Sequence, residues 1–292
     1  MPTIALICAL ALAAEPPAAE TAKPTPPMEL TVDESFDPPI PAPAYSKGQG
    51  PLILVDQRHR NVVSLTSYFG PVGRYLARDG YTVRPLSEPF SATSLKDARI
   101  VVVINAQSPE GSPEGTSAFG ESEIRSLDEW VRHGGGFLFI ADRAPFGGPA
   151  SALGKALGVT FDNNTILRHG PDGKPDGVLT LEVKTSGKPT HPLFNEVSQL
   201  VYVVGESLRG PAPILTAPKN TYSAPTMNAP DGPDASGKPL ALAFSRGSGR
   251  VVVVGDAGIF SAFGSVNGPT HRGISEADNA RFLRNVVRWL VR

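Results

Sequence analysis

The sequence predicts an α/β protein built around a parallel sheet. Residues 52–55, 100–104 and 137–140 are short runs rich in Val, Ile and Leu, which is typical of strands buried on both faces. Between these runs, residues 65–78 and 121–133 carry apolar side chains at helical spacing. Because strands that alternate with helices form right-handed crossovers, we expect a parallel sheet with helices on its faces.

Helix ends and short connections complete this half of the fold. Asp79-Gly80 ends the first helix and Gly134 ends the second, because glycine adopts positive φ without strain. A strand is expected at residues 81–86, and a further helix at about residues 149–157. Strand and helix therefore alternate throughout this half.

Beyond that helix the pattern changes to short strands separated by loops rich in Gly, Pro and Asn. We expect strands at residues 178–183, 200–204 and 213–217. A hairpin follows, with strands at 240–245 and 250–255 joined by a glycine-containing turn. This part predicts a β-rich extension of the α/β domain.

The final helix is the clearest element of the sequence. Ser275 and Asp278 resemble an acidic capping box at its start. Apolar residues from Phe282 to Leu290 form one wide face at helical spacing. We expect this face to pack on the sheet.

The N-terminal segment predicts export to the periplasm or secretion. Residues 3–14 are a short apolar run with a small-residue cleavage pattern, so residues 1–14 are interpreted as a signal peptide. The run is too short to span a bilayer, and no transmembrane segment is expected in the mature chain. Residues 15–50 hold nine of the 30 prolines and no apolar periodicity, which predicts a flexible linker without core contacts. The globular domain is expected at residues 51–292.

Composition and missing motifs exclude several functions. The 292 residues include 27 Lys and Arg against 28 Asp and Glu, so no overall positive charge favours nucleic acid. The single cysteine, Cys8, lies in the predicted signal peptide, which leaves the domain without a cysteine nucleophile or metal ligand. The chain has no G-x-S-x-G, H-E-x-x-H or P-loop motif. No catalytic residue, metal or cofactor is assigned.

Polar residues directly follow four of the predicted strands. These are Asp56, Asn105, Asp142 and Asp256. Ligands of an open parallel sheet bind beyond the carboxyl ends of its strands, so we expect these side chains to converge on one rim. The alternative is that each one only caps the turn that follows its strand.

The loop after the first strand is the most polar segment of this rim, with His59 and Asn61 close to Asp56. A histidine beside carboxylates can act as an acid, a base or a metal ligand. A loop histidine without such a role is the commoner case. Asp56, His59 and Asp142 are of types that bind zinc or manganese, but their spacing is not diagnostic.

Five segments resemble the class I glutamine amidotransferase-like superfamily. They read LVDQRHRN at 54–61, RDGY at 78–81, GGGFLFIADRAPFGG at 134–148, GRVVVVGDAGIFSAF at 249–263 and DNARFLRNVVRWL at 278–290. The resemblance is to the branch of unknown function related to gliding-motility ABC-transport proteins and intraflagellar-transport type domains. It covers about residues 51–292 and implies a flavodoxin-like parallel sheet flanked by helices.

The resemblance also implies a degenerate site. In the amidotransferases a cysteine occupies the turn after a central strand, whereas the corresponding turn here is Ala141-Asp142-Arg143. Glutamine hydrolysis is therefore not expected. What remains is an implied pocket lined by Asp56, His59, Asn61, Asp142, Arg143, Phe146 and Asp256, to which the strand-end Asn105 is added.

Two functions are compatible with this pocket. The first is an exported, non-catalytic binding module for a polar small molecule, such as a saccharide or envelope component, or for a protein partner. The alternative is a hydrolase in which Asp56 or Asp142, together with His59, activates water directly or through a metal. A strongly raised carboxylate pKa in a closed pocket would favour the hydrolase, and an open rim would favour binding.

Overall fold

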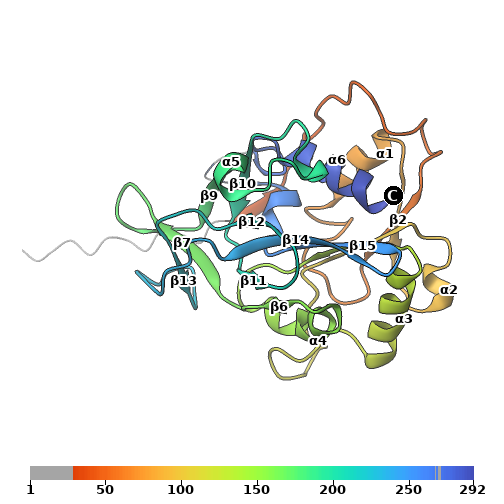
Figure 1. The fold of residues 1–292 in the computed structure, drawn as a ribbon, viewed down its shortest axis with the longest axis horizontal. Coiled ribbons are helices and arrows are strands. Elements are labelled where there is room, and N and C mark those ends of the chain that lie inside the picture. The colour runs from red at the N-terminus through yellow and green to blue at the C-terminus, as the bar shows by residue number, and fades with distance from the viewer. Residues whose placement is uncertain (1–28, 267, 269–270) are drawn as a thin grey trace, which may run out of the picture.

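The computed structural model describes residues 29–266, 268 and 271–292 (Figure 1). The predicted signal peptide and the first part of the predicted linker lie outside these residues. No helix in the described ranges is long and apolar enough to cross a membrane.

A seven-stranded sheet forms the centre of the fold. Its spatial order is β12 (Pro213–Thr216), β14 (Pro239–Arg246), β15 (Gly249–Val254), β5 (Gly136–Ile140), β4 (Ile100–Ile104), β2 (Leu52–Asp56) and β3 (Thr82–Leu86). The strands from β15 to β3 are parallel to one another. Strand β14 runs antiparallel to β15, and β12 at the edge runs antiparallel to β14. The parallel strands follow the order 2-1-3-4-5 of a doubly wound, flavodoxin-like sheet. The predicted fold class is therefore observed, as a mixed α/β fold with a mostly parallel sheet.

Helices cover both faces of this sheet. The side chains of β4 and β5 are therefore buried on both faces. The helices α1 (Gly70–Arg78) and α6 (Asn279–Leu290) pack on one face. The helices α2 (Ala92–Leu95), α3 (Glu121–Arg132) and α4 (Gly147–Leu157) pack on the other face (Figure 1). Alternate side chains of each strand thus pack into two separate hydrophobic cores, one on each face of the sheet.

Two details of the helices differ from the prediction. The first helix begins at Gly70 rather than at residue 65, because Pro71 is tolerated only in the first turn of a helix. At the start of α6, the Asp278 side chain makes no capping bond. Its carboxylate instead accepts the backbone N–H of Ser198 at 2.8 Å and of Gln199 at 3.1 Å, so the expected capping box does not form.

Three small antiparallel sheets surround the antiparallel side of the fold. They are β6 (Thr160–Phe161) with β11 (Leu208–Arg209), β9 (Val178–Glu182) with β10 (Gln199–Val203), and β8 (Pro175–Asp176), β7 (Thr165–His169) and β13 (Thr221–Ala224). The short segments α5 (Val183–Ser186) and η1 (Pro192–Phe194) lie between β9 and β10. The expected strand at residues 213–217 forms β12 and joins the central sheet rather than a separate part.

The edges of the central sheet are irregular. Pro85 lies within β3, which is paired only on its β2 side. At the other edge β12 begins at Pro213, and its pairing with β14 contains two register shifts. A proline lacks the backbone N–H that a strand edge donates, so both edges are interrupted.

The segment before the sheet packs on the domain, which corrects the predicted linker for residues 29–50. Strand β1 (Leu30–Val32) pairs with β16 (Ala262–Ser265), which follows the short helix η2 (Gly258–Phe260) and also pairs with β17 (Arg272–Gly273). Phe36 is buried against Tyr75, with ring centroids 5.3 Å apart. The segment lacks apolar periodicity because only isolated side chains reach the core.

A buried ion pair fixes the end of this segment. Asp79 is fully buried and accepts two bonds from Arg284, at 2.8 and 3.1 Å, and one from the Ala44 backbone N–H at 2.9 Å. Arg284 also donates to the Ala42 carbonyl at 2.8 Å. The pair therefore joins residues 42–44, the end of α1, and α6.

Candidate functional site

The loops after β2, β4 and β5 meet at the carboxyl edge of the sheet, where the crossover direction changes between β2 and β4. This is the position at which doubly wound sheets bind ligands. The Gln107 backbone N–H donates to the His59 carbonyl at 3.0 Å, and the Asn61 side chain donates to the Ile104 carbonyl at 3.0 Å. Asn105 accepts the Asp142 backbone N–H at 2.9 Å through its side-chain oxygen. The three loops thus form one connected rim.

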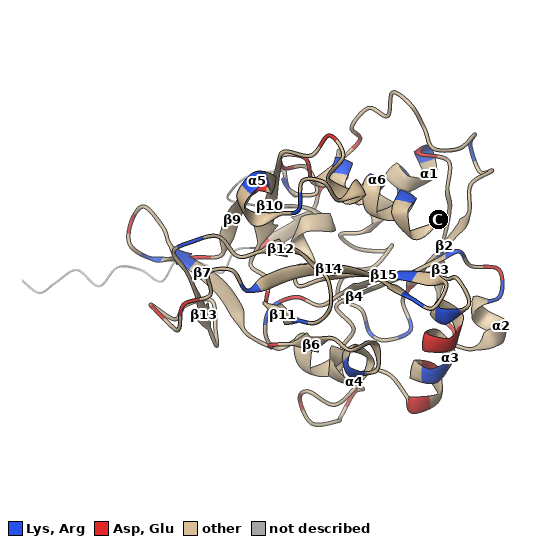
Figure 2. Ribbon diagram, viewed as in Figure 1, with Lys and Arg blue, Asp and Glu red and all other residues tan. Residues whose placement is uncertain are grey.

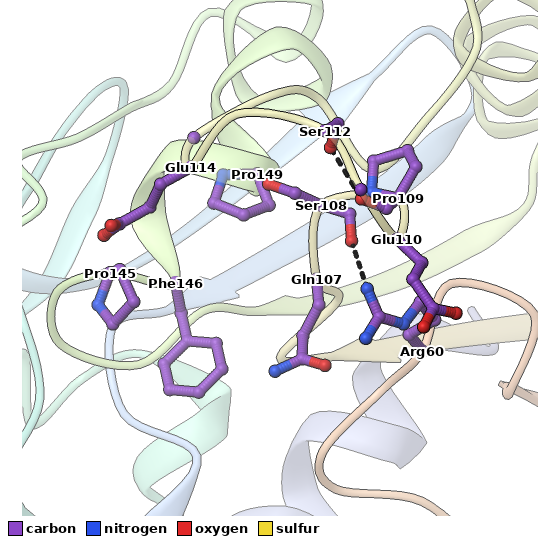
Figure 3. Close-up of a pocket in the computed structure, with 12 residues that line it drawn as sticks. Arg60, Gln107, Ser108, Pro109, Glu110, Ser112, Glu114, Pro145, Phe146 and Pro149 are labelled. Atoms are coloured by element: carbon purple, nitrogen blue, oxygen red, sulfur yellow. Dashed lines mark hydrogen bonds between the residues drawn. The ribbon is translucent and has the colours of Figure 1, made fainter.

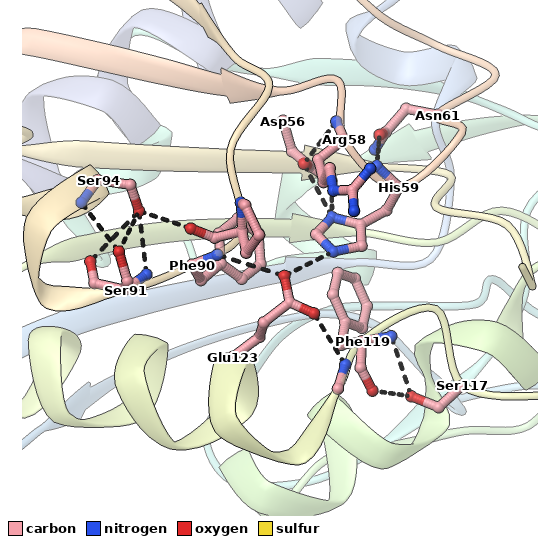
Figure 4. Close-up of polar contacts among 12 residues, drawn as sticks. Asp56, Arg58, His59, Asn61, Phe90, Ser91, Ser94, Ser117, Phe119 and Glu123 are labelled. Carbon is pink, nitrogen blue, oxygen red and sulfur yellow. Dashed lines mark hydrogen bonds and ion pairs between the residues drawn. The ribbon is translucent and has the colours of Figure 1, made fainter.

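His59 is held between two carboxylates on this rim (Figure 4). Its Nδ1 lies 2.9 Å from both Asp56 oxygens, and its Nε2 lies 3.1 Å from Glu123 Oε1. The imidazole ring also contacts Phe90 and Phe119, with centroid distances of 5.0 and 4.6 Å. Asp56 is fully buried and His59 is 7% exposed. The imidazole is therefore enclosed by two carboxylates and two aromatic rings.

The charged groups around His59 shift its pKa. Burial lowers its pKa, but the hydrogen bond and charge of Asp56 and the charge of Glu123 outweigh burial, so the pKa of His59 is raised. When the ring is protonated, it donates one N–H to each carboxylate and has no lone pair for a metal or a substrate proton. Both ring nitrogens thus lie beside carboxylates, which favours an ion pair over a free base.

A second acidic group lies beyond β5 and β15. Asp142 and Asp256 interact electrostatically, and burial raises the pKa of Asp142 to about 6. Burial and the Asp142 charge also raise the pKa of Asp256, against the lowering effect of three backbone N–H groups, those of Val203, Gly258 and Ile259, that donate to its carboxylate. Asp256 is fully buried, so it acts inside the fold rather than on a ligand.

Glu123 and Glu206 also lie in this region, and neither was predicted from the sequence. Glu123 accepts the Gly120 backbone N–H at 2.9 Å as the third residue of α3, a capping position that the sequence pattern does show. Glu206 accepts the Asn163 backbone N–H at 2.6 Å, and burial raises its pKa well above the usual range. Its Oε1 is buried without a partner in the described residues. No sequence signal marks Glu206, because its surroundings come from distant segments.

A cleft of about 270 Å³ opens above this rim (Figure 3). Its lining includes Arg60 and Gln107 from the loops after β2 and β4, Glu110 and Glu114 from the loop before α3, and Phe146 at the start of α4. The Arg60 guanidinium donates to the Ser108 carbonyl at 2.9 Å. The cleft therefore combines one aromatic side chain, one cation, one amide and two carboxylates.

The backbone at this rim is left-handed in two places. Arg60 has a φ of 51° and Asn105 a φ of 46°. Asparagine adopts this conformation readily, whereas for arginine it is costly, and such costs concentrate at functional sites. Both residues lie where the loops after β2 and β4 turn toward the cleft.

The predicted site residues divide into three sets. Asp56, His59 and Asn61 form the first, since the Asn61 oxygen accepts the His59 backbone N–H at 3.2 Å. Asn105, Asp142 and Arg143 form the second, where the Arg143 guanidinium lies 3.5 Å from Asp142, and Asp256 lies close enough to interact electrostatically. Phe146 is the third set, because it is the one predicted residue that lines the cleft. Arg60 and Gln107 also line the cleft but were not predicted.

Within the described ranges, no group of three or more His, Cys, Asp or Glu side chains could hold a metal ion.

Comparison with solved structures finds several that are similar to this chain. The mmIFT52 N-terminal domain matches with a TM-score of 0.62 and 14% identity, over 82% of this chain and 97% of that domain. A putative ThuA-like protein from Parabacteroides merdae matches with a TM-score of 0.48 and 11% identity, over 82% of this chain and 89% of that one. An exo-beta-1,4-mannosidase from Opitutaceae bacterium strain TAV5 matches with a TM-score of 0.36 and 15% identity, over 71% of this chain and 31% of the mannosidase.

The first of these matches establishes the fold and nothing further. It agrees with the expected resemblance to intraflagellar-transport type domains at the level of architecture. No family model matches the chain. No curated protein matches it either.

Proposed function

We propose that the protein is an exported, non-catalytic binding module of the class I glutamine amidotransferase-like type, whose cleft binds a polar small molecule the size of a monosaccharide. The observation that carries the proposal is the composition of the cleft, with Phe146 beside Gln107, Arg60 and two glutamates. Periplasmic or secreted localisation and a β-rich extension are parts of the same proposal. The connected rim described above supplies a fixed support for such a site.

The chemistry of a sugar ring suits this lining. A pyranose has an apolar C–H face and a polar edge of hydroxyl groups. In the view of Figure 3 the Phe146 ring and the Gln107 amide lie next to one another. Phe146 offers an apolar surface, and Gln107, Glu110 and Glu114 offer donors and acceptors for hydroxyls. At about 270 Å³ the cleft is smaller than most drug-sized sites, which favours a single sugar ring.

The non-catalytic part of the proposal rests on where the strand-end groups are engaged. Asp56 and His59 bind one another beneath the rim, and Asp256 accepts three backbone N–H groups. None of these three residues lines the cleft. A ligand in the cleft therefore does not meet these three residues, and Glu110 and Glu114 of the lining are assigned to hydroxyl binding.

The binding experiment uses a panel of neutral mono- and disaccharides with isothermal titration calorimetry. We expect saturable binding to one class of sugar, and Phe146→Ala should weaken it about tenfold, because an aromatic contact of roughly 1.4 kcal/mol corresponds to that factor. Phe263→Ala is the matched control, since Phe263 is also half-buried but lies in β16. Equal affinities of the two variants, or no binding across the panel, would contradict the proposal.

A hydrolase is the second candidate, and one observation favours it. Asp142 has a pKa raised to about 6 by burial, which suits a general acid at neutral pH. Asp142 lies four residues before Phe146 of the cleft. Release of nitrophenol from nitrophenyl glycosides, abolished by Asp142→Asn, would favour the hydrolase over the binding module. Release that Asp142→Asn leaves unchanged would exclude this assignment of Asp142.

A further inference from the structure

A second cavity, of about 260 Å³, lies beside the C-terminal turn of α6. Leu290 of α6 lies against Gly136, the first residue of β5, so this cavity is at the amino end of the parallel strands, opposite the cleft. Its lining consists of Pro192, Asn195, Asn285, Arg288, Trp289 and Arg292. The lining therefore contains two cationic side chains, one indole and no carboxylate side chain.

The residues around this cavity add positive charge. The Arg250 guanidinium lies 5.0 Å from the centre of the Trp289 ring and donates to the Trp289 carbonyl at 2.8 Å. Arg99 donates to the Val291 carbonyl through two nitrogens, at 2.8 and 3.0 Å. These bonds neutralise the carbonyl groups at the end of α6, which would otherwise disfavour an anion.

The acidic groups nearby already have partners. Asp79 is paired with Arg284 at 2.8 Å, and Glu196 with Arg281 at 2.5 Å. Arg288 forms a second, longer ion pair with Asp79, with 3.6 Å between Nη2 and Oδ1. The arginines along α6 are visible as blue segments in Figure 2. Among the described residues, Arg250 and Arg292 form no ion pair with a carboxylate side chain, so their two charges border the cavity beside Arg288.

Arg288 supplies a partly exposed cation. Its Nη2 donates to the Ala42 carbonyl at 3.1 Å, but its Nε is buried and has no partner in the described residues. The Arg288 side chain as a whole is 38% exposed, so an anion in the cavity would pair with the accessible part of its guanidinium rather than with the enclosed Nε.

From these contacts we propose that the cavity between α6 and η1 is a binding site for a phosphate or carboxylate group. Arg288 and Arg292 bind the anion, and the Trp289 ring forms an apolar wall for the group that carries it. The Asn285 amide nitrogen donates to the carbonyls of Leu193 and Asn195, so anion recognition depends on the arginines. The site is independent of the cleft and of its proposed ligand.

Tryptophan fluorescence of the full chain tests this site directly. The protein has two tryptophans, so Trp130→Phe leaves Trp289 as the reporter. Titration with sodium phosphate at constant ionic strength should change Trp289 emission saturably. Arg288→Gln and Arg292→Gln should each weaken binding about tenfold, the factor for losing one charge-assisted hydrogen bond of roughly 1.4 kcal/mol. Arg209→Gln is the control, because Arg209 lies in β11, outside this cavity.

A second pair of titrations distinguishes a free phosphate from the headgroup of a lipid. Phosphatidylcholine vesicles with phosphatidic acid are compared with pure phosphatidylcholine vesicles in the same assay. A response to free phosphate indicates a soluble ligand, and a response only to phosphatidic acid indicates a lipid headgroup. The proposal is overturned if neither probe is bound, if chloride alone gives the same response, or if both arginine variants respond like the parent. Arg292→Gln keeps the test valid if Arg288→Gln does not fold, since Arg292 is exposed.

Discussion

Replacing His59 by leucine is the most informative test of the rim. The change leaves Asp56, which is fully buried, without the cation that lies 2.9 Å from both of its oxygens. Removing one partner of a buried ion pair costs about 3 to 5 kcal/mol. For a domain of this size, 1 kcal/mol lowers the melting temperature by roughly 2 to 4 °C, so a fall on the order of 10 °C is expected.

The assay is urea and thermal unfolding of the parent, His59→Leu and the double variant Asp56→Asn/His59→Leu at pH 6. The double variant should recover part of the lost stability, because an amide is cheaper to bury than an unpaired carboxylate. In the parent, the raised pKa of His59 adds stability that is fully present below the unfolded value of about 6.5 and is lost as the pH rises through the folded value. The reasoning is refuted if His59→Leu loses less than about 1 kcal/mol, or if the double variant is no more stable than the single one.

Three further predictions concern stability. A chain that starts at residue 51 should melt lower than one that starts at residue 29, because it loses β1 and the roughly 2 kcal/mol from burying Phe36; equal calorimetric melting temperatures would contradict this. Arg284→Met should destabilise by about 3 kcal/mol or more and speed hydrogen exchange at residues 42–45, since the buried Asp79 loses its main partner. Raising the pH from 4 to 7 should lower the free energy of unfolding through Asp142. The folded pKa of Asp142, about 6, exceeds its unfolded value, so the folded state binds more protons over this range. Asp142→Asn should therefore make the melting temperature depend less on pH.

The elements predicted correctly are those whose signal lies within a few consecutive residues. The buried runs at residues 52–55, 100–104 and 137–140 became β2, β4 and β5, because a strand buried on both faces needs an unbroken apolar segment. Strand β1 has no such run, and two of its three residues are exposed. Its partner β16 is more than 200 residues away, so only the folded structure reveals it.

The edge of the sheet at which the strand-end residues lie was predictable, but the residues that line the cleft were not. The strand-end rule placed Asp56, Asn105 and Asp142 at one edge of the sheet, where the structure connects their loops. The rule says nothing about which side chains face solvent. Glu123 is 64 residues from His59 in sequence but contacts its Nε2 in the fold, so the second carboxylate beside this histidine could not be predicted.

The interruptions at both edges of the central sheet affect whether strands of neighbouring molecules can pair with it. Pro85 in β3 removes a donor from one edge, and Pro213 with the two register shifts of β12 breaks the other. An unbroken row of backbone donors and acceptors at a sheet edge is what allows strands of neighbouring molecules to join. Each edge lacks a backbone donor at its proline, and Gly187 bridges Leu215 on β12, so neither edge offers the unbroken row that edge-to-edge aggregation requires.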